Sequence, residues 1–163
     1  MVSECIAKNN GRSSDVDEKL DEDCVRGLPG WRVVGGLHNE EACADGDWVA
    51  GAAAFGRFRS ELESHFASEE ELLFPAFERA TGMTAGPTAV MRGEHEQMRA
   101  LLGQMADAVA ARDAETFGGT AETLLILMQQ HNMKEENILY PMCDNALAAT
   151  DLAESLAQRL VPA

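Results

Sequence analysis

The sequence predicts an all-α protein organised as an up-down four-helix bundle. Apolar residues recur at largely helical spacing through three long segments, and short breaker segments separate them. Three long helices with short links are typical of such a bundle, and a bundle of this size needs a fourth element to close its core. In addition, one eleven-residue segment occurs twice in the chain, once in each of two predicted helices.

Length and charge restrict the class of protein. The 163 residues suffice for one domain with a sizeable core. A formal net charge of -15 repels nucleic-acid phosphates and anionic membrane surfaces, so we expect neither as a partner. No apolar run approaches the ~20 residues of a membrane span, and the start of the chain lacks the apolar core of a signal peptide. We therefore expect a cytoplasmic protein.

Three regions are predicted along the chain. Residues 1–28 are polar and acidic, and we expect a mostly disordered tail there. Residues 29–148 should form the bundle, and residues 149–163 a short amphipathic helix. Residues 15–44 must supply the first helix of the bundle. That helix is predicted to be degenerate, because residues 28–36 contain one Pro and three Gly, which are unfavourable in a helix interior.

The other three helices are predicted from apolar spacing and from the breakers beside them. Asp47 follows a turn and offers an N-cap for the second helix. That helix should end near Pro75 or slightly beyond it, before the breaker segment TGMTAGP at residues 81–87. Arg112-Asp113 should form a tight link between the third and fourth helices. The predicted helices cover about 48–75, 88–111 and 114–145.

The repeated segment carries the residues that suggest a function. It reads HFASEEELLFP from His65 and HNMKEENILYP from His131. Residues i and i+4 lie on the same face of a helix, so His65 projects beside Glu69, and His131 beside Glu135. An imidazole beside a carboxylate, presented twice, is what a two-metal site in a helical bundle needs.

Two further histidines can be tested by their level along the bundle. His95 lies about 17 residues before the turn near residue 112 and His131 about 18 after it, so the two should come level on antiparallel helices. His38 fails the same test, because in a simple hairpin it lies roughly 15 Å short of the level of His65. At the right level the chain offers Glu22, Asp23 and Cys24.

Over residues 45–145, the two His-x-x-x-Glu-Glu segments with a Glu-His helix between them resemble the hemerythrin-like (HHE cation-binding) family. The resemblance implies a four-helix bundle that holds two Fe ions in a non-haem di-iron centre. Glu69 and Glu135 would then bridge the irons. Glu70 and Glu136 lie about 140° round their helices from His65 and His131, so we expect them beside the ligands or in solvent. By position, the implied ligands are His65, Glu69, His95, His131 and Glu135.

Two positions depart from the oxygen-carrying members of that family. Arg99 stands where they have a second histidine on the third helix, and the first helix lacks a convincing histidine. Fewer nitrogen ligands would leave coordination positions open, which favours redox chemistry over reversible oxygen carriage. We expect a protein that binds or senses O2, NO or peroxide, or handles iron and oxidative stress, rather than a dedicated enzyme. A protein partner or homo-oligomer is left open.

Other readings compete with this one. A ferritin-like carboxylate oxidase would present Glu-x-x-His, whereas here His comes first and the spacing is four. A mononuclear zinc hydrolase would be typified by His-Glu-x-x-His, which the chain lacks. A bundle with a lapsed or altered metal site would act as an interaction or regulatory module. The cysteines form no C-x-x-C pair and are predicted to be free thiols: Cys5, Cys24, Cys43 and Cys143.

Overall fold

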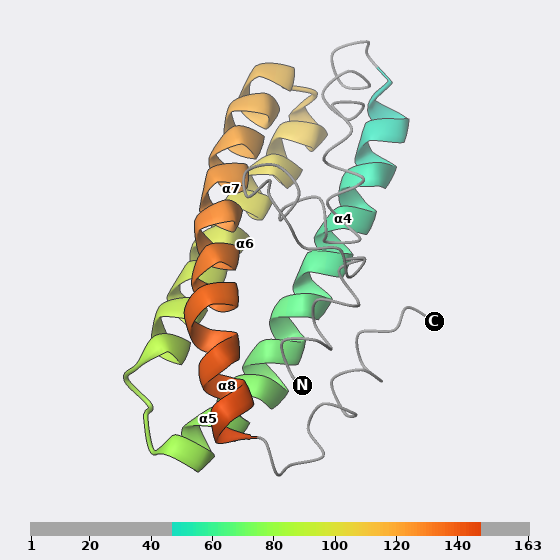
Figure 1. Ribbon diagram of the computed structural model, residues 1–163. Coiled ribbons are helices and arrows are strands. Elements are labelled where there is room, and N and C mark those ends of the chain that lie inside the picture. Colours follow the sequence, from blue (N-terminus) through green and yellow to red (C-terminus); the bar gives the residue numbers. More distant parts are fainter. Residues whose placement is uncertain (1–46, 148–163) are drawn as a thin grey trace, which may run out of the picture.

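The computed structural model describes residues 47–147, and this part of the chain is helical throughout apart from short links (Figure 1). The all-α prediction is therefore confirmed. The predicted tail, the degenerate first helix and the C-terminal helix lie outside the described residues, as do His38 and three of the cysteines. The elements are α4 (Trp48–Ser68), η2 (Glu69–Leu73), α5 (Phe74–Thr81), α6 (Pro87–Ala111), α7 (Ala114–Lys134), η3 (Glu135–Leu139) and α8 (Tyr140–Ala146).

The three long helices lie alongside one another. Helix α6 packs against both α4 and α7, and α5 and α8 pack together at one end (Figure 1). Between residues 47 and 147, no helix is both long and apolar enough to cross a membrane.

The links between the helices follow from local chemistry. The Asp47 side chain accepts a hydrogen bond from the Ala50 amide and caps α4, as predicted. The Asp113 side chain likewise accepts a hydrogen bond from the Thr116 amide and caps α7. Gly82 ends α5 at a φ of 74°, a left-handed conformation that glycine adopts without steric cost. Arg112 takes the same conformation at a φ of 55° to make the tight turn before α7.

Each copy of the repeat contains a π-helical turn that the sequence analysis did not anticipate. The turns begin at Glu69 and Glu135, where the backbone amides of Phe74 and Tyr140 bond to carbonyls five residues back. Pro75 and Pro141 provide a reason. Proline has no amide to donate and clashes with the carbonyl four residues earlier, which disfavours the ordinary α-helical turn. Such π-turns are frequent at functional sites.

The core consists of two apolar clusters with polar residues between them. One contains Phe55, Phe58, Leu62, Phe66, Met98, Leu102, Met105, Ala108, Phe117, Leu124 and Met128. The other contains Leu73, Phe74, Ala76, Phe77, Met91, Leu139, Tyr140, Cys143 and Leu147. On α4–η2, α6 and α7–η3 alike, buried histidine or glutamate side chains fall between the members of the two clusters. The fold therefore places a layer of buried polar side chains, the polar layer, across an otherwise apolar core.

Candidate metal centre

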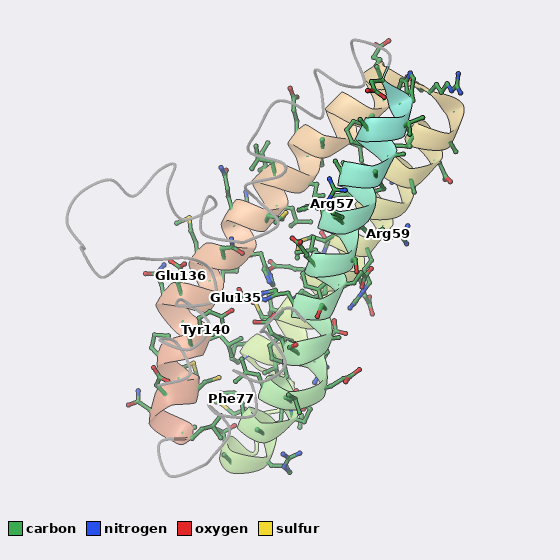
Figure 2. The ribbon with its side chains drawn as sticks, turned by 90° about the vertical axis from the view of Figure 1, so that its right-hand side faces the viewer. Arg57, Arg59, Phe77, Glu135, Glu136 and Tyr140 are labelled. Carbon is green, nitrogen blue, oxygen red and sulfur yellow. The ribbon has the colours of Figure 1, made fainter. Side chains whose placement is uncertain are left out.

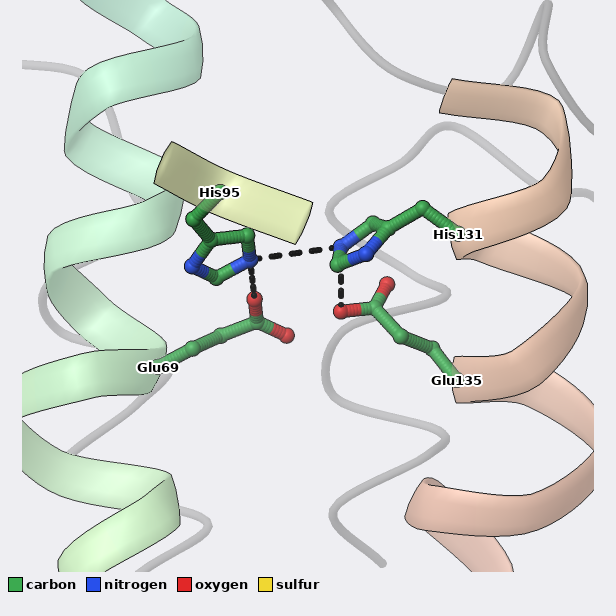
Figure 3. A group of neighbouring side chains, drawn as sticks. All are labelled: Glu69, His95, His131 and Glu135. Atoms are coloured by element: carbon green, nitrogen blue, oxygen red, sulfur yellow. Dashed lines mark hydrogen bonds and ion pairs between the residues drawn. The ribbon is translucent and has the colours of Figure 1, made fainter. Parts of the chain in front are cut away.

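Four of the five predicted ligands meet in the polar layer. The residues Glu69, His95, His131 and Glu135 are all at least 98% buried, and one ligand atom from each lies within 4.8 Å of all the others. They come from three elements, η2, α6 and the α7–η3 helix (Figure 3). His95 and His131 thus come level, as the count of residues along the two helices predicted.

The distances suit a metal ion. Nε2 of His95 lies 3.3 Å from Nε2 of His131 and 3.3 Å from Oε2 of Glu69, and Nε2 of His131 lies 2.9 Å from Oε1 of Glu135. Two atoms that are each about 2.1 Å from a metal lie about 3.0 Å apart at a right angle and about 3.4 Å apart at the tetrahedral angle. Two imidazoles and two carboxylates are also a donor set that iron accepts.

Two buried carboxylate oxygens in the cluster have no hydrogen-bond partner among residues 47–147. They are Oε2 of Glu69 and Oε1 of Glu135, the same two atoms that face the imidazole nitrogens. A buried carboxylate oxygen without a donor is costly, so a folded protein retains one where a cation binds. The residues present therefore fit a metal ion.

The outer nitrogen of each imidazole is held by a further glutamate. Nδ1 of His95 donates to Glu70 over 2.8 Å, and Nδ1 of His131 donates to Glu94 over 3.0 Å. A proton on Nδ1 leaves the lone pair on Nε2, which is the tautomer that binds a metal at the centre of the cluster. Glu70 thus lies beside a ligand, as expected. Glu94 was not predicted, although its place before His95 in GEHEQM was a signal that could have found it.

Each of these outer glutamates is in turn paired with a cation. Arg99 binds both oxygens of Glu70, over 2.8 and 3.1 Å, and Lys134 pairs with Glu94. Arg99 therefore does not reach the metal cluster as a histidine there would, and stabilises the glutamate behind His95 instead. In both glutamates burial raises the pKa, but hydrogen bonds from the cation and the imidazole lower the pKa overall.

The buried charges influence one another strongly. Burial raises the pKa of Glu69, but the charge of His65 and the contacts with His95 outweigh it and bring the pKa to about 2. Burial and the nearby charge of Glu69 raise the pKa of Glu135. Burial lowers the pKa of His131, yet Glu135 and its neighbours raise it to about 9. The cluster attracts a cation, either a proton on His131 or a metal ion.

His65 lies at the edge of the cluster. Its Nε2 is 3.6 Å from Oε2 of Glu69, and its side chain is 12% exposed, so it is the most accessible of the five predicted ligands. Phe66 forms one wall of the site, because its ring stacks on His95 with centroids 4.0 Å apart and meets His131 edge-on. Arg99 covers the Phe66 ring at 5.1 Å from its centroid.

Tyr140 is a second residue of the site that the sequence analysis did not predict. Its hydroxyl lies 2.8 Å from Oε1 of Glu69 and 2.9 Å from Oε2 of Glu135. In an ordinary α-helix residues five apart point about 140° from each other, and the π-turn brings Tyr140 back over Glu135. Figure 2 shows both side chains along the inner side of their helix. The aromatic position shared by the two repeats was the available signal.

Comparison with known proteins agrees with this geometry. The family model described as the hemerythrin HHE cation-binding domain matches residues 32–143. The chain belongs to this family. Among curated proteins, the iron-sulfur cluster repair protein YtfE of Edwardsiella ictaluri (strain 93-146) is 33% identical over 93 residues. The alignment covers 51% of this chain and 42% of that relative, so the chain spans less than half of its length. No solved structure gives a significant match.

The family match spans both copies of the repeat. Cys143 lies outside the cluster, in the apolar layer behind Tyr140. It is free and fully buried, and burial raises the pKa of its thiol to about 12. A thiol in that state is a poor nucleophile.

Proposed function

We propose that this protein is a non-haem iron protein with two iron positions that share Glu69 and Glu135. His95 and His131 would serve one position and His65 the other. One observation carries the proposal: two buried carboxylate oxygens without hydrogen-bond partners face two imidazole nitrogens at metal-ligand spacing. Bound iron would supply a redox couple and open positions for a small ligand such as O2, NO or peroxide.

The protein's own residues would prepare the site for that chemistry. Glu70 and Glu94 hold the imidazoles in the metal-binding tautomer, and the stacked ring of Phe66 fixes the plane of His95. The apolar clusters on either side exclude water, which strengthens the electrostatic attraction of the carboxylates for a cation. The accessible edge at His65 is the side from which a small molecule would reach the metals.

The biological role we propose is iron handling under oxidative stress, including the repair of iron–sulfur clusters. The similarity to YtfE supports this role over oxygen carriage. Arg99 in place of a ligand supports it as well, because it leaves fewer nitrogen donors around the metal. Fewer protein donors leave more coordination positions accessible to oxidants, which favours redox chemistry over reversible oxygen carriage.

The test is metal content per chain together with the ultraviolet–visible spectrum, on protein purified without chelator and on protein reconstituted with Fe(II). About two irons per chain with oxo-bridge absorption after exposure to air would support the proposal. His131→Ala should lose most of the iron. The exposed glutamate on the same helix offers a control, and Glu122→Gln should retain it. Zinc alone, or no metal after reconstitution, would refute the iron site and favour an interaction module.

A further inference from the structure

The two copies of the repeat differ at the aromatic position before the proline, and both residues at that position reach the cluster. The first has Phe74 and the second has Tyr140, the only tyrosine of the chain. The ring of Phe74 lies against His95, with centroids 5.8 Å apart and planes inclined by 24°. Tyr140 places a hydroxyl between the two carboxylates instead. Both repeats supply the same histidine–glutamate pair, but they differ at this aromatic position.

The Tyr140 hydroxyl lies beside one particular oxygen of each carboxylate. Its single proton is shared between Oε1 of Glu69 and Oε2 of Glu135, at 2.8 and 2.9 Å, while the opposite oxygens face His95 and His131. A carboxylate that bridges two metal ions uses one oxygen for each ion. The hydroxyl therefore holds the two oxygens that a second ion would need, and it turns the other two toward the first ion.

The nitrogen donors also favour the first ion over the second. Two imidazoles, both at least 98% buried, face the oxygens left free by Tyr140. Among residues 47–147, His65 is the one remaining histidine near the cluster, and its side chain is partly exposed. The first position thus has a complete set of four donors. The second has two oxygens beside the Tyr140 hydroxyl and a single imidazole, and the Nε2 of that imidazole lies 3.6 Å from Oε2 of Glu69, an oxygen of the first position.

We propose that Tyr140 makes the two metal positions unequal. The protein takes its first ion at Glu69 Oε2, Glu135 Oε1, His95 and His131, and takes a second only when the Tyr140 hydroxyl leaves the two carboxylates. This inference rests on the proposed function, because it assumes that the carboxylates are shared by two ions. It assigns Tyr140 a positioning role that sets the order and relative affinity of metal binding.

The experiment is calorimetric titration of metal-free protein with Fe(II) under nitrogen, for the wild type and for Tyr140→Phe. The wild type should bind two ions with clearly different dissociation constants. A hydrogen bond to a charged group is worth about one factor of ten in an equilibrium constant, so Tyr140→Phe should bind the second ion about tenfold more tightly. The first ion should change less than about threefold, because its four donors remain.

A matched control removes another buried hydroxyl that bonds to a carboxylate. Thr88 is fully buried and donates to Glu78 over 2.8 Å, away from the cluster. Thr88→Val should leave both dissociation constants unchanged. Circular dichroism of all variants would show whether they keep the helical fold. Because Phe occupies the matching position of the first repeat, we expect Tyr140→Phe to fold.

A second measurement follows Tyr140 in the unaltered protein. With one tyrosine in the chain, labelling with [ζ-13C]tyrosine gives one resonance, and Zn(II) serves as a diamagnetic probe. The resonance should shift mainly with the second equivalent of Zn(II), when the hydroxyl loses its carboxylate partners. A shift that is complete at the first equivalent would overturn the proposal.

The outcomes separate this inference from the proposed function. Two ions of equal affinity in the wild type, or an unchanged or wider ratio of dissociation constants in Tyr140→Phe, would overturn the role of Tyr140 and leave a di-iron protein. Failure of the wild type to bind any ion would overturn both. Tighter second binding in Tyr140→Phe, with the Thr88→Val control unchanged, would support both.

Discussion

Replacing Phe66 by leucine should both destabilise the protein and weaken its metal site. Phe66 is fully buried; its ring stacks on His95, and the Arg99 guanidinium lies 5.1 Å from the ring centroid. An aromatic pair is worth about 0.5–1.5 kcal/mol beyond area burial. A partly exposed cation–π contact is worth about 0.5–1 kcal/mol. Leucine loses both contacts, so the ring-specific loss is about 1–2.5 kcal/mol.

A second phenylalanine separates this loss from the change in volume. Phe77 is equally buried in the other apolar cluster, and within residues 47–147 it has neither a ring partner nor a cation over its face. Phe77→Leu should therefore lose packing alone. In urea unfolding of the metal-free protein, the free energy of unfolding should fall further for Phe66→Leu than for Phe77→Leu, by about 1–2.5 kcal/mol.

Metal binding supplies an independent readout. The ring plane of His95 is set by Phe66, so its loss lets the imidazole tilt, and the affinity for Zn(II) should fall about tenfold in Phe66→Leu. Phe77→Leu should bind Zn(II) as the wild type does. Equal destabilisation by the two substitutions, or unchanged affinity in Phe66→Leu, would show that Phe66 is ordinary core and refute the reasoning.

Three further predictions concern charge and reactivity. Glu94→Gln should weaken Zn(II) binding by about 10- to 100-fold in a calorimetric titration, because it loosens the hydrogen bond that orients His131. Glu122→Gln, on an exposed face, should bind Zn(II) as the wild type does. Equal affinities in the two variants would contradict the role of Glu94. Because the pKa of His131 is raised, its charged form stabilises the metal-free fold below pH 6.5, and this contribution disappears as the pH rises through about 9. The free energy of unfolding in urea should therefore fall over this pH range. In His131→Gln the part of the fall that comes from His131 should be absent. With Cys5, Cys24 and Cys43 replaced by serine, native protein at pH 8 should react with a thiol reagent only as fast as it unfolds; rapid labelling would show that Cys143 is accessible.

Much of the helical scaffold was predictable, because it depends on local signals. Asp47 and Asp113 cap helices through contacts three residues away, and Gly82 ends one through its own backbone freedom. The level of His95 with His131 followed from a constant rise per residue on two helices joined by a tight turn. Pairs such as His131 and Glu135 were predictable for the same reason, since four residues make about one helical turn.

The parts of the site that were missed depend on packing between distant segments. Tyr140 and Glu69 are 71 positions apart, and their contact requires a π-turn that moves the aromatic ring around its helix. Arg99 could not be assigned from its position, because its place over Phe66 and against Glu70 depends on how α6 sits beside α4 and η2. By itself, the sequence determined the helices, the repeated imidazole–carboxylate pairs and the level at which they meet. Only the tertiary structure decided which carboxylate oxygens face the imidazoles and which the tyrosine, because that choice depends on side-chain directions set by packing between helices.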